Sequence, residues 1–178
     1  MTLRWRMEKG AAAVDSVPDA AATHRARFPV RIVGRILLVA VVVLTAAATP
    51  GILACRSSSL YRSAPVDAAG PDFINAVAAI DTTLAPLALL DALQALETRH
   101  GRERPYKNAP RTLDLDLLLY GATAMDTPRL CLPHPRMHQR AFVLAPLGEL
   151  APELVLPQGP LQALLAQLAD QPIERLPG

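Results

Sequence analysis

Leu113-Asp114-Leu115-Asp116-Leu117 is the stretch of this 178-residue chain that says most about its fold. Apolar and acidic residues alternate strictly, which predicts a strand, because successive side chains of a strand point to opposite faces. The leucines would line one face and both carboxylates the other, with the two Asp Cα atoms about 6.5–7 Å apart. Two neighbouring anions repel each other, and a bound cation relieves that cost. Hard oxygen ligands of this kind suit Mg²⁺.

Basic residues precede this strand at Arg102, Arg104, Lys107 and Arg111. Cations beside a metal-binding carboxylate pair are what a polyphosphate substrate requires. The alternatives are a solvated face of an edge strand, or a basic loop that pairs with the carboxylates directly. The chain contains no glycine-rich GxxxxGK[ST] loop, so phosphate groups would be held by side chains and metal.

The neighbouring segments predict two strands and two helices. Residues 72–81 alternate with a period of two and form one strand, and residues 112–120 form the other. A helix is expected to begin at Pro86 and to end before Gly101, with an apolar stripe of Leu87, Leu90, Leu93 and Leu96. A second helix is expected over residues 160–170. The order strand, helix, strand, helix predicts an α/β or α+β domain.

Composition narrows the function classes. The chain is 51% hydrophobic and 19% charged, as is ordinary for one globular domain. Residues 1–55 carry seven Lys/Arg against three Asp/Glu, whereas residues 56–178 carry eleven against thirteen. Neither part combines clustered basic and aromatic residues, so we expect no nucleic-acid partner. Two cysteines cannot build a disulfide framework, and no Cys/His spacing matches a zinc site.

The first 55 residues differ from the rest of the chain in composition and in hydrophobic periodicity. Residues 1–30 show no sustained periodicity and are predicted to be a poorly ordered leader. The apolar stretch 36–48 follows three arginines and resembles a secretory signal, although it is short for a membrane span. Residues 52–55 resemble a lipoprotein cleavage box. The alternative is a buried strand or helix.

The run Pro110-Arg111-Thr112-Leu113-Asp114-Leu115-Asp116, followed by Pro133-His134, resembles the signature of 6-hydroxymethyl-7,8-dihydropterin pyrophosphokinases. Similar stretches at 58–65, 71–76 and 140–154 extend the resemblance to about residues 57–160. It implies an α+β, ferredoxin-like sandwich with an antiparallel sheet. It also implies transfer of pyrophosphate from ATP to 6-hydroxymethyl-7,8-dihydropterin, which gives AMP and the pterin diphosphate in folate biosynthesis.

The resemblance implies a role for each of several residues in metal, phosphate and nucleotide binding. Asp114 and Asp116 would hold two Mg²⁺ ions, and Arg102 and Arg111 would contact the phosphates in the transition state. The ATP co-substrate would be bound by Gln94, Glu97, Arg104, Arg129, His134 and Arg140.

For the pterin, the resemblance implies a flat ring between Phe73 and Phe142. Asn75 would read the hydrogen-bonding edge of the ring, and the pocket would be lined by Ser63, Pro65 and Val66. From the residues alone, an ordinary place in the core is the favoured interpretation of both phenylalanines.

The family begins with a strand and a Gly-Ser-Asn or Gly-Ala-Asn turn, and residues 1–55 contain no such pattern. We therefore expect that first strand and turn to be missing or replaced. Residues 1–55 would be an atypical leader that is not native to the domain, and residues 56–178 would be the pyrophosphokinase domain. The alternative function is an inactive or membrane-tethered relative that binds pterin or nucleotide. We expect a cytoplasmic monomer without membrane contact, the alternative being anchoring or export through residues 27–55.

Overall fold

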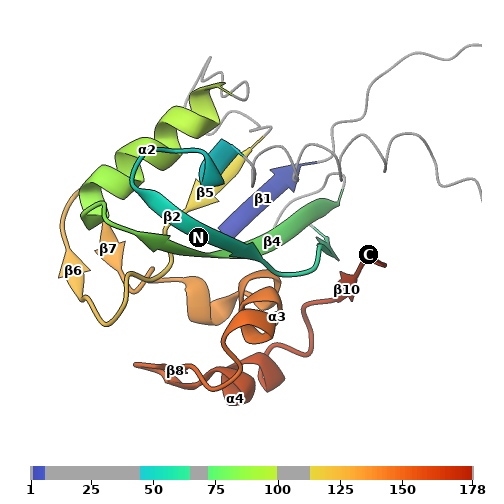
Figure 1. The fold of residues 1–178 in the computed structure, drawn as a ribbon. Coiled ribbons are helices and arrows are strands. Elements are labelled where there is room, and N and C mark those ends of the chain that lie inside the picture. The colour runs from blue at the N-terminus through green and yellow to red at the C-terminus, as the bar shows by residue number, and fades with distance from the viewer. Residues whose placement is uncertain (1, 7–44, 65–71, 100–112, 178) are drawn as a thin grey trace, which may run out of the picture.

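The computed structural model describes residues 2–6, 45–64, 72–99 and 113–177. They form a six-stranded main sheet with helices on both faces, together with two small two-stranded sheets (Figure 1). The strands of the main sheet follow the order β10-β3-β4-β1-β5, and β2 also pairs with β4. Every pairing in this sheet is antiparallel. These strands are β1 (Thr2–Arg6), β2 (Ile52–Ser57), β3 (Tyr61–Ser63), β4 (Phe73–Thr82), β5 (Asp114–Asp116) and β10 (Ile173–Arg175).

Strand β4 is the longest, and its side chains alternate between two cores. Ala76 and Ala78 belong to the core on one face, and Val77 belongs to the core on the other. This alternation is the one expected from the period of two in residues 72–81, so that prediction is confirmed. One edge of β4 pairs with β3 and β2, and the other pairs with β1.

Helix α2 (Pro86–Arg99) covers one face of the sheet. It begins at the predicted Pro86, and Leu90, Leu93 and Leu96 of the predicted stripe are buried. Leu89 is buried as well, which widens the stripe. These leucines pack with Leu113, Leu115 and Leu117, so α2 is held over β5 by apolar contact.

Helices α3 (Ala141–Leu150) and α4 (Leu161–Ala166) cover the opposite face (Figure 1). The short elements around them are β6 (Met125–Asp126), β7 (Cys131–Leu132), the 3₁₀ turn η1 (Met137–Gln139), β8 (Val155–Leu156) and β9 (Gly159–Pro160). Sequence reasoning missed α3, because all of its residues except Gly148 and Glu149 are apolar, which leaves no distinct apolar stripe, and because Pro146 lies inside it.

Three predictions of secondary structure need correction. Residues 2–6 form β1, so the poorly ordered leader is wrong there; this strand occupies the position between β4 and β5. Of the strand predicted over 112–120, the described residues form strand only at Asp114–Asp116, the three residues that pair with Thr2 to Arg4 of β1. The helix predicted over 160–170 spans only Leu161–Ala166, and residues 167–170 continue as turns.

Strand β2 spans residues 52–57 and thus crosses the expected boundary between residues 55 and 56. Most of the apolar stretch 36–48 lies outside the described residues. Within the described part of the chain, no helix is long and apolar enough to cross a membrane.

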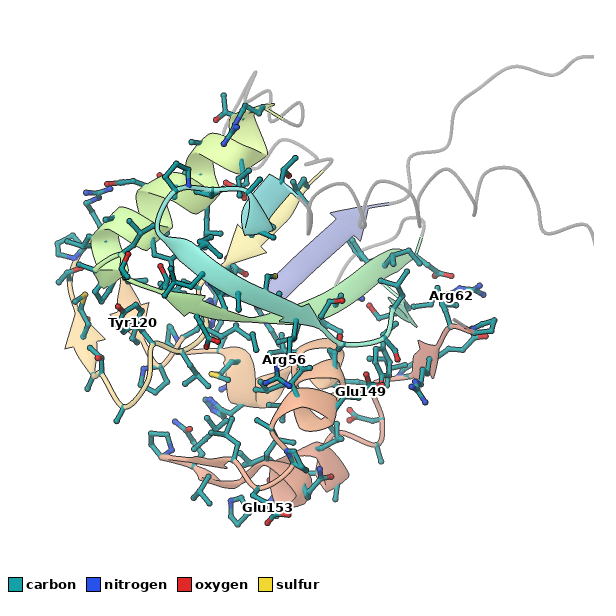
Figure 2. The ribbon with its side chains drawn as sticks, viewed as in Figure 1. Arg56, Arg62, Tyr120, Glu149 and Glu153 are labelled. Carbon is teal, nitrogen blue, oxygen red and sulfur yellow. The ribbon has the colours of Figure 1, made fainter. Side chains whose placement is uncertain are left out.

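A polar cluster around Glu149 joins α3 to the end of the sheet formed by β3 and β10. The Glu149 carboxylate accepts hydrogen bonds from the Ser59 backbone N–H and the Tyr61 hydroxyl, both at 2.7 Å. Its Oε1 is also 3.0 Å from the Arg175 Nε, while Arg62 pairs with Glu174 nearby. Figure 2 shows Glu149 between α3 and the end of the sheet that carries Arg62. The cluster fixes β3 against α3.

These contacts change two pKa values. Burial raises the pKa of Tyr61 to about 12, and its hydrogen bond to the Glu149 carboxylate adds to this. Burial alone would raise the pKa of Glu149, but the hydrogen bonds from Ser59 and Tyr61 and the charge of Arg175 outweigh it and lower that pKa. A lowered carboxyl pKa stabilises the fold above the unfolded-state pKa, and this stabilisation is lost as the pH falls through the folded-state pKa.

We predict that Glu149→Gln lowers the free energy of unfolding at about pH 7 by about 1–2 kcal/mol, because charge-assisted hydrogen bonds are replaced by weaker ones and the site is partly solvated. The difference from the unchanged protein should shrink as the pH falls from about 5 to about 3. Urea unfolding followed by circular dichroism at several pH values measures both effects.

The control is Glu153→Gln, since Glu153 is exposed, lies apart from this cluster and has no hydrogen bond with the described residues (Figure 2). A Glu149→Gln protein whose stability falls with pH as steeply as that of the unchanged chain would contradict this account.

Candidate functional site

Six of the residues implied for nucleotide and metal binding line one cavity of about 330 Å³. We call it the β5 cavity. Its walls come from α2, β5, the β6–β7 connection and the segment after β7, which are distant in sequence. The implied residues are Gln94, Glu97, Asp114, Asp116, Arg129 and His134. The structure therefore brings together one side of the predicted site.

Asp114 and Asp116 lie half-buried on either side of the buried Leu115. The alternation predicted from the sequence is thus confirmed: Leu115 joins the apolar core while both carboxylates line the β5 cavity. Among the described residues, no group of three or more His, Cys, Asp and Glu side chains could hold a metal ion. Two carboxylates beside a cavity with room for phosphate still fit Mg²⁺, which commonly takes one or two carboxylates and completes its shell with water and phosphate oxygens.

Glu97 on α2 is 2% exposed, and its Oε1 accepts a hydrogen bond of 2.9 Å from the backbone N–H of Leu115. The family resemblance implies that Glu97 lies near ATP. In the structure its carboxylate contacts the backbone of Leu115, between the two aspartates.

His134 follows the cis Leu132–Pro133 peptide bond and lines the same cavity. Burial lowers its pKa; the charge of Asp116 opposes this shift, and those of Arg140 and Arg136 add to it. Its Nδ1 accepts a hydrogen bond of 3.2 Å from the Arg136 backbone N–H. The neutral imidazole then carries its proton on Nε2, which can act as a donor.

Arg129 and Arg140 supply positive charge to the site. Arg129 forms an ion pair with Asp91 of α2, and both side chains are more than half exposed. Burial lowers the pKa of Arg140, and the charges of Asp116 and Asp114 oppose this shift, so its guanidinium lies within the field of the carboxylate pair. The same guanidinium lies over the Phe142 ring, 5.6 Å from its centroid. Arg140 thus links the carboxylate pair to the aromatic side of the site.

Two of the implied pterin residues, Ser63 and Phe142, line a smaller cavity of about 170 Å³. We call it the Ser63 cavity. Asn75 is fully buried beside it, and its Nδ2 donates hydrogen bonds to Ser63 Oγ at 2.9 Å and to the Tyr61 carbonyl at 3.4 Å. Its Oδ1 has no hydrogen-bond partner among the described residues. A buried acceptor without a partner is costly, which suggests a ligand that donates to it.

Phe73 lies opposite Ser63 in the β3–β4 register and is half-buried, although it does not line the Ser63 cavity. Phe142 is 4% exposed and belongs to the apolar core of α3 and α4. It is therefore a core residue that also lines the Ser63 cavity.

Gln171 was missed by sequence reasoning. Its Oε1 accepts from the Ala141 N–H at 2.9 Å, its Nε2 donates to the Gln139 carbonyl at 3.0 Å, and it lines the Ser63 cavity. No local motif marks it, since its partners are about thirty positions away. The remaining implied site residues, Pro65, Val66, Arg102, Arg104 and Arg111, lie outside the described residues.

Comparison with known proteins agrees with the geometry. The family model described as 7,8-dihydro-6-hydroxymethylpterin-pyrophosphokinase matches residues 35–152. Three relatives are named 2-amino-4-hydroxy-6-hydroxymethyldihydropteridine pyrophosphokinase. The protein from Pseudomonas aeruginosa is 57% identical over 123 residues, which is 68% of this chain and 76% of the relative. That from Haemophilus influenzae is 47% identical over 122 residues, covering 67% and 76%, and that from Methylorubrum extorquens is 42% identical over 131 residues, covering 73% and 83%.

The match and the geometry concern the same residues, because the family range includes α2, β5, the β6–β7 connection and α3, whose side chains line the two cavities. The chain belongs to the 7,8-dihydro-6-hydroxymethylpterin-pyrophosphokinase family.

Proposed function

We propose that this chain transfers pyrophosphate from ATP to 6-hydroxymethyl-7,8-dihydropterin, as a step of folate biosynthesis. The observation that carries the proposal is the β5 cavity, which Asp114 and Asp116 line together with His134 and Arg129. The names of the relatives support the same activity. They also favour it over the alternative of an inactive binding protein.

In the proposed reaction the hydroxymethyl oxygen of the pterin attacks the β-phosphorus of ATP. The bond from that phosphorus to the α,β-bridging oxygen breaks, AMP leaves, and the hydroxyl proton passes to solvent. The chain's main contribution is to hold the two substrates in line. Mg²⁺ bound by Asp114 and Asp116 would neutralise charge on the phosphate oxygens.

The nucleotide-side residues have distinct tasks in this proposal. His134 would donate from Nε2 to the nucleotide, since its Nδ1 is already engaged by the Arg136 backbone. Arg129 would exchange its exposed ion pair with Asp91 for a phosphate, at little cost. Arg102 and Arg111 would clamp the transferring phosphates, as the family resemblance implies.

The pterin would occupy the Ser63 cavity, where Ser63 and the Tyr61 carbonyl hold the Nδ2 of Asn75. The Oδ1, which has no partner within the described part of the chain, then accepts a hydrogen bond from a ring N–H. Arg140 lies over Phe142 and within the field of Asp116. It therefore sits between the two substrates, where it can hold phosphate beside the stacked ring.

We further propose a ferredoxin-like arrangement in which β1 stands in for the family's first strand. The strand order β5-β1-β4-β3 and its antiparallel pairings support this. Residues 56–178 would hold most of the catalytic domain, and the protein would act as a cytoplasmic monomer.

We predict that Asp116→Asn lowers AMP release by about two orders of magnitude, because the metal site loses one of its two charged ligands. The assay mixes purified protein with Mg²⁺, ATP and 6-hydroxymethyl-7,8-dihydropterin and measures AMP by chromatography. Asp81→Asn is the matched control, since Asp81 is an exposed strand aspartate away from the β5 cavity. Unchanged turnover in Asp116→Asn would remove this carboxylate from the reaction, and no AMP from the folded unchanged chain would overturn the proposed function.

We predict that Asn75→Ala raises the KM for the pterin about tenfold or more and leaves the KM for ATP within about twofold, because only the pterin loses a buried hydrogen bond. Steady-state kinetics with each substrate varied in turn measure the two constants. Gln167→Ala, which removes an exposed amide of the segment after α4, should change neither. An equal rise in both KM values would show that Asn75 supports the fold and does not read the pterin.

A further inference from the structure

Glu97 is the only charged residue among the buried residues of the described part of the chain. A buried carboxylate is costly unless hydrogen bonds compensate it. The compensation includes the Leu115 N–H, 2.9 Å from Glu97 Oε1. Leu115 is the single residue between Asp114 and Asp116, so Glu97 binds the backbone at the midpoint of the metal-binding pair.

The position of β5 explains why this contact is needed. In the order β10-β3-β4-β1-β5, β5 is the outermost strand described, and among the described strands β1 is its partner. No described strand pairs with its other edge, where buried N–H groups need acceptors from elsewhere. Glu97 supplies one from α2, and a charged acceptor makes a stronger bond than a carbonyl would.

We propose that Glu97 is a positioning residue for metal binding, which fixes the β5 backbone so that Asp114 and Asp116 present their carboxylates to one ion-binding patch. The proposal rests on the metal role given to these aspartates under the proposed function. It assigns Glu97 a task other than the nucleotide contact implied by the family resemblance. Loss of such supporting contacts typically weakens metal binding 10–100-fold, since ligand orientation is relaxed.

The test measures Mn²⁺ binding by electron paramagnetic resonance, in the presence of a non-hydrolysable ATP analogue, with the full chain. Glu97→Ala should weaken Mn²⁺ binding about tenfold or more. Glu97→Gln should stay within about threefold of the unchanged chain, because its amide oxygen still accepts from Leu115. Thr98→Ala is the control: Thr98 is the exposed neighbour on α2, and its hydroxyl donates to the Gln94 carbonyl of the same helix, so binding should not change.

Two results would overturn the proposal. One is unchanged Mn²⁺ binding in Glu97→Ala. The other is a Glu97→Gln protein that binds Mn²⁺ as weakly as Glu97→Ala does. That result would show that the negative charge of Glu97 acts directly on the bound metal or nucleotide. Where Glu97→Ala does not fold, Glu97→Asp replaces it, because the shortened side chain cannot keep the same reach, and the same two outcomes apply.

Hydrogen exchange at the Leu115 amide is a second readout that does not depend on catalysis. It should be protected in the unchanged chain and in Glu97→Gln, and should exchange faster in Glu97→Ala. Equal exchange in all three would also overturn the proposal. An unchanged chain that binds Mn²⁺ through this contact but releases no AMP would leave the positioning role standing while removing the proposed function.

Discussion

Backbone pairing along β4 is the constraint on which the rest of the molecule depends. Its first half pairs with β1 on one edge and β3 on the other, and its second half pairs with β2. Alternate side chains of the same strand belong to the two cores, so the packing of both α2 and α3 depends on the position of β4. The two cavities therefore keep a fixed relation to each other, because each is built from elements that β4 positions.

The two sides of the site rest on different supports. On the carboxylate side, β5 is held by apolar packing against α2 and by the hydrogen bond from the Leu115 N–H to the buried Glu97 carboxylate. The aromatic side is held by polar contacts, with Glu149 fixing β3 and Gln171 tying the C-terminal segment to the start of α3. Arg140 spans the two. Under the proposed function, substitutions in the core and at the polar cluster should therefore affect nucleotide and pterin binding separately.

Short-range periodicity made much of this predictable. The alternation at 113–117 located the carboxylate pair, and the leucine spacing from Pro86 located α2. The extent of β5 was not predictable, because it depends on where β1 supplies a partner. Helix α3 carries no amphipathic signal, since both β4 and α4 pack against it.

Contacts between residues distant in sequence were also beyond local reasoning. Glu97 and Leu115 are eighteen positions apart, and Ser59 and Glu149 are ninety apart. No spacing rule connects such pairs, and the first 55 residues offered no motif from which the pairing of β1 could be inferred. The family resemblance implied roles for individual residues, and the structure shows which neighbouring residues hold their side chains in place.

The buried Oδ1 of Asn75, which no described residue donates to, has a consequence for the stability of the protein as a whole. With no donor from the described residues, this desolvated acceptor costs about 1–3 kcal/mol, and a bound donor would recover this free energy. Ligand binding and folding are thermodynamically linked, so the melting temperature would depend on the concentration of whatever fills the Ser63 cavity. In a cell that lacks this ligand, the same protein would be easier to unfold and more exposed to proteolysis.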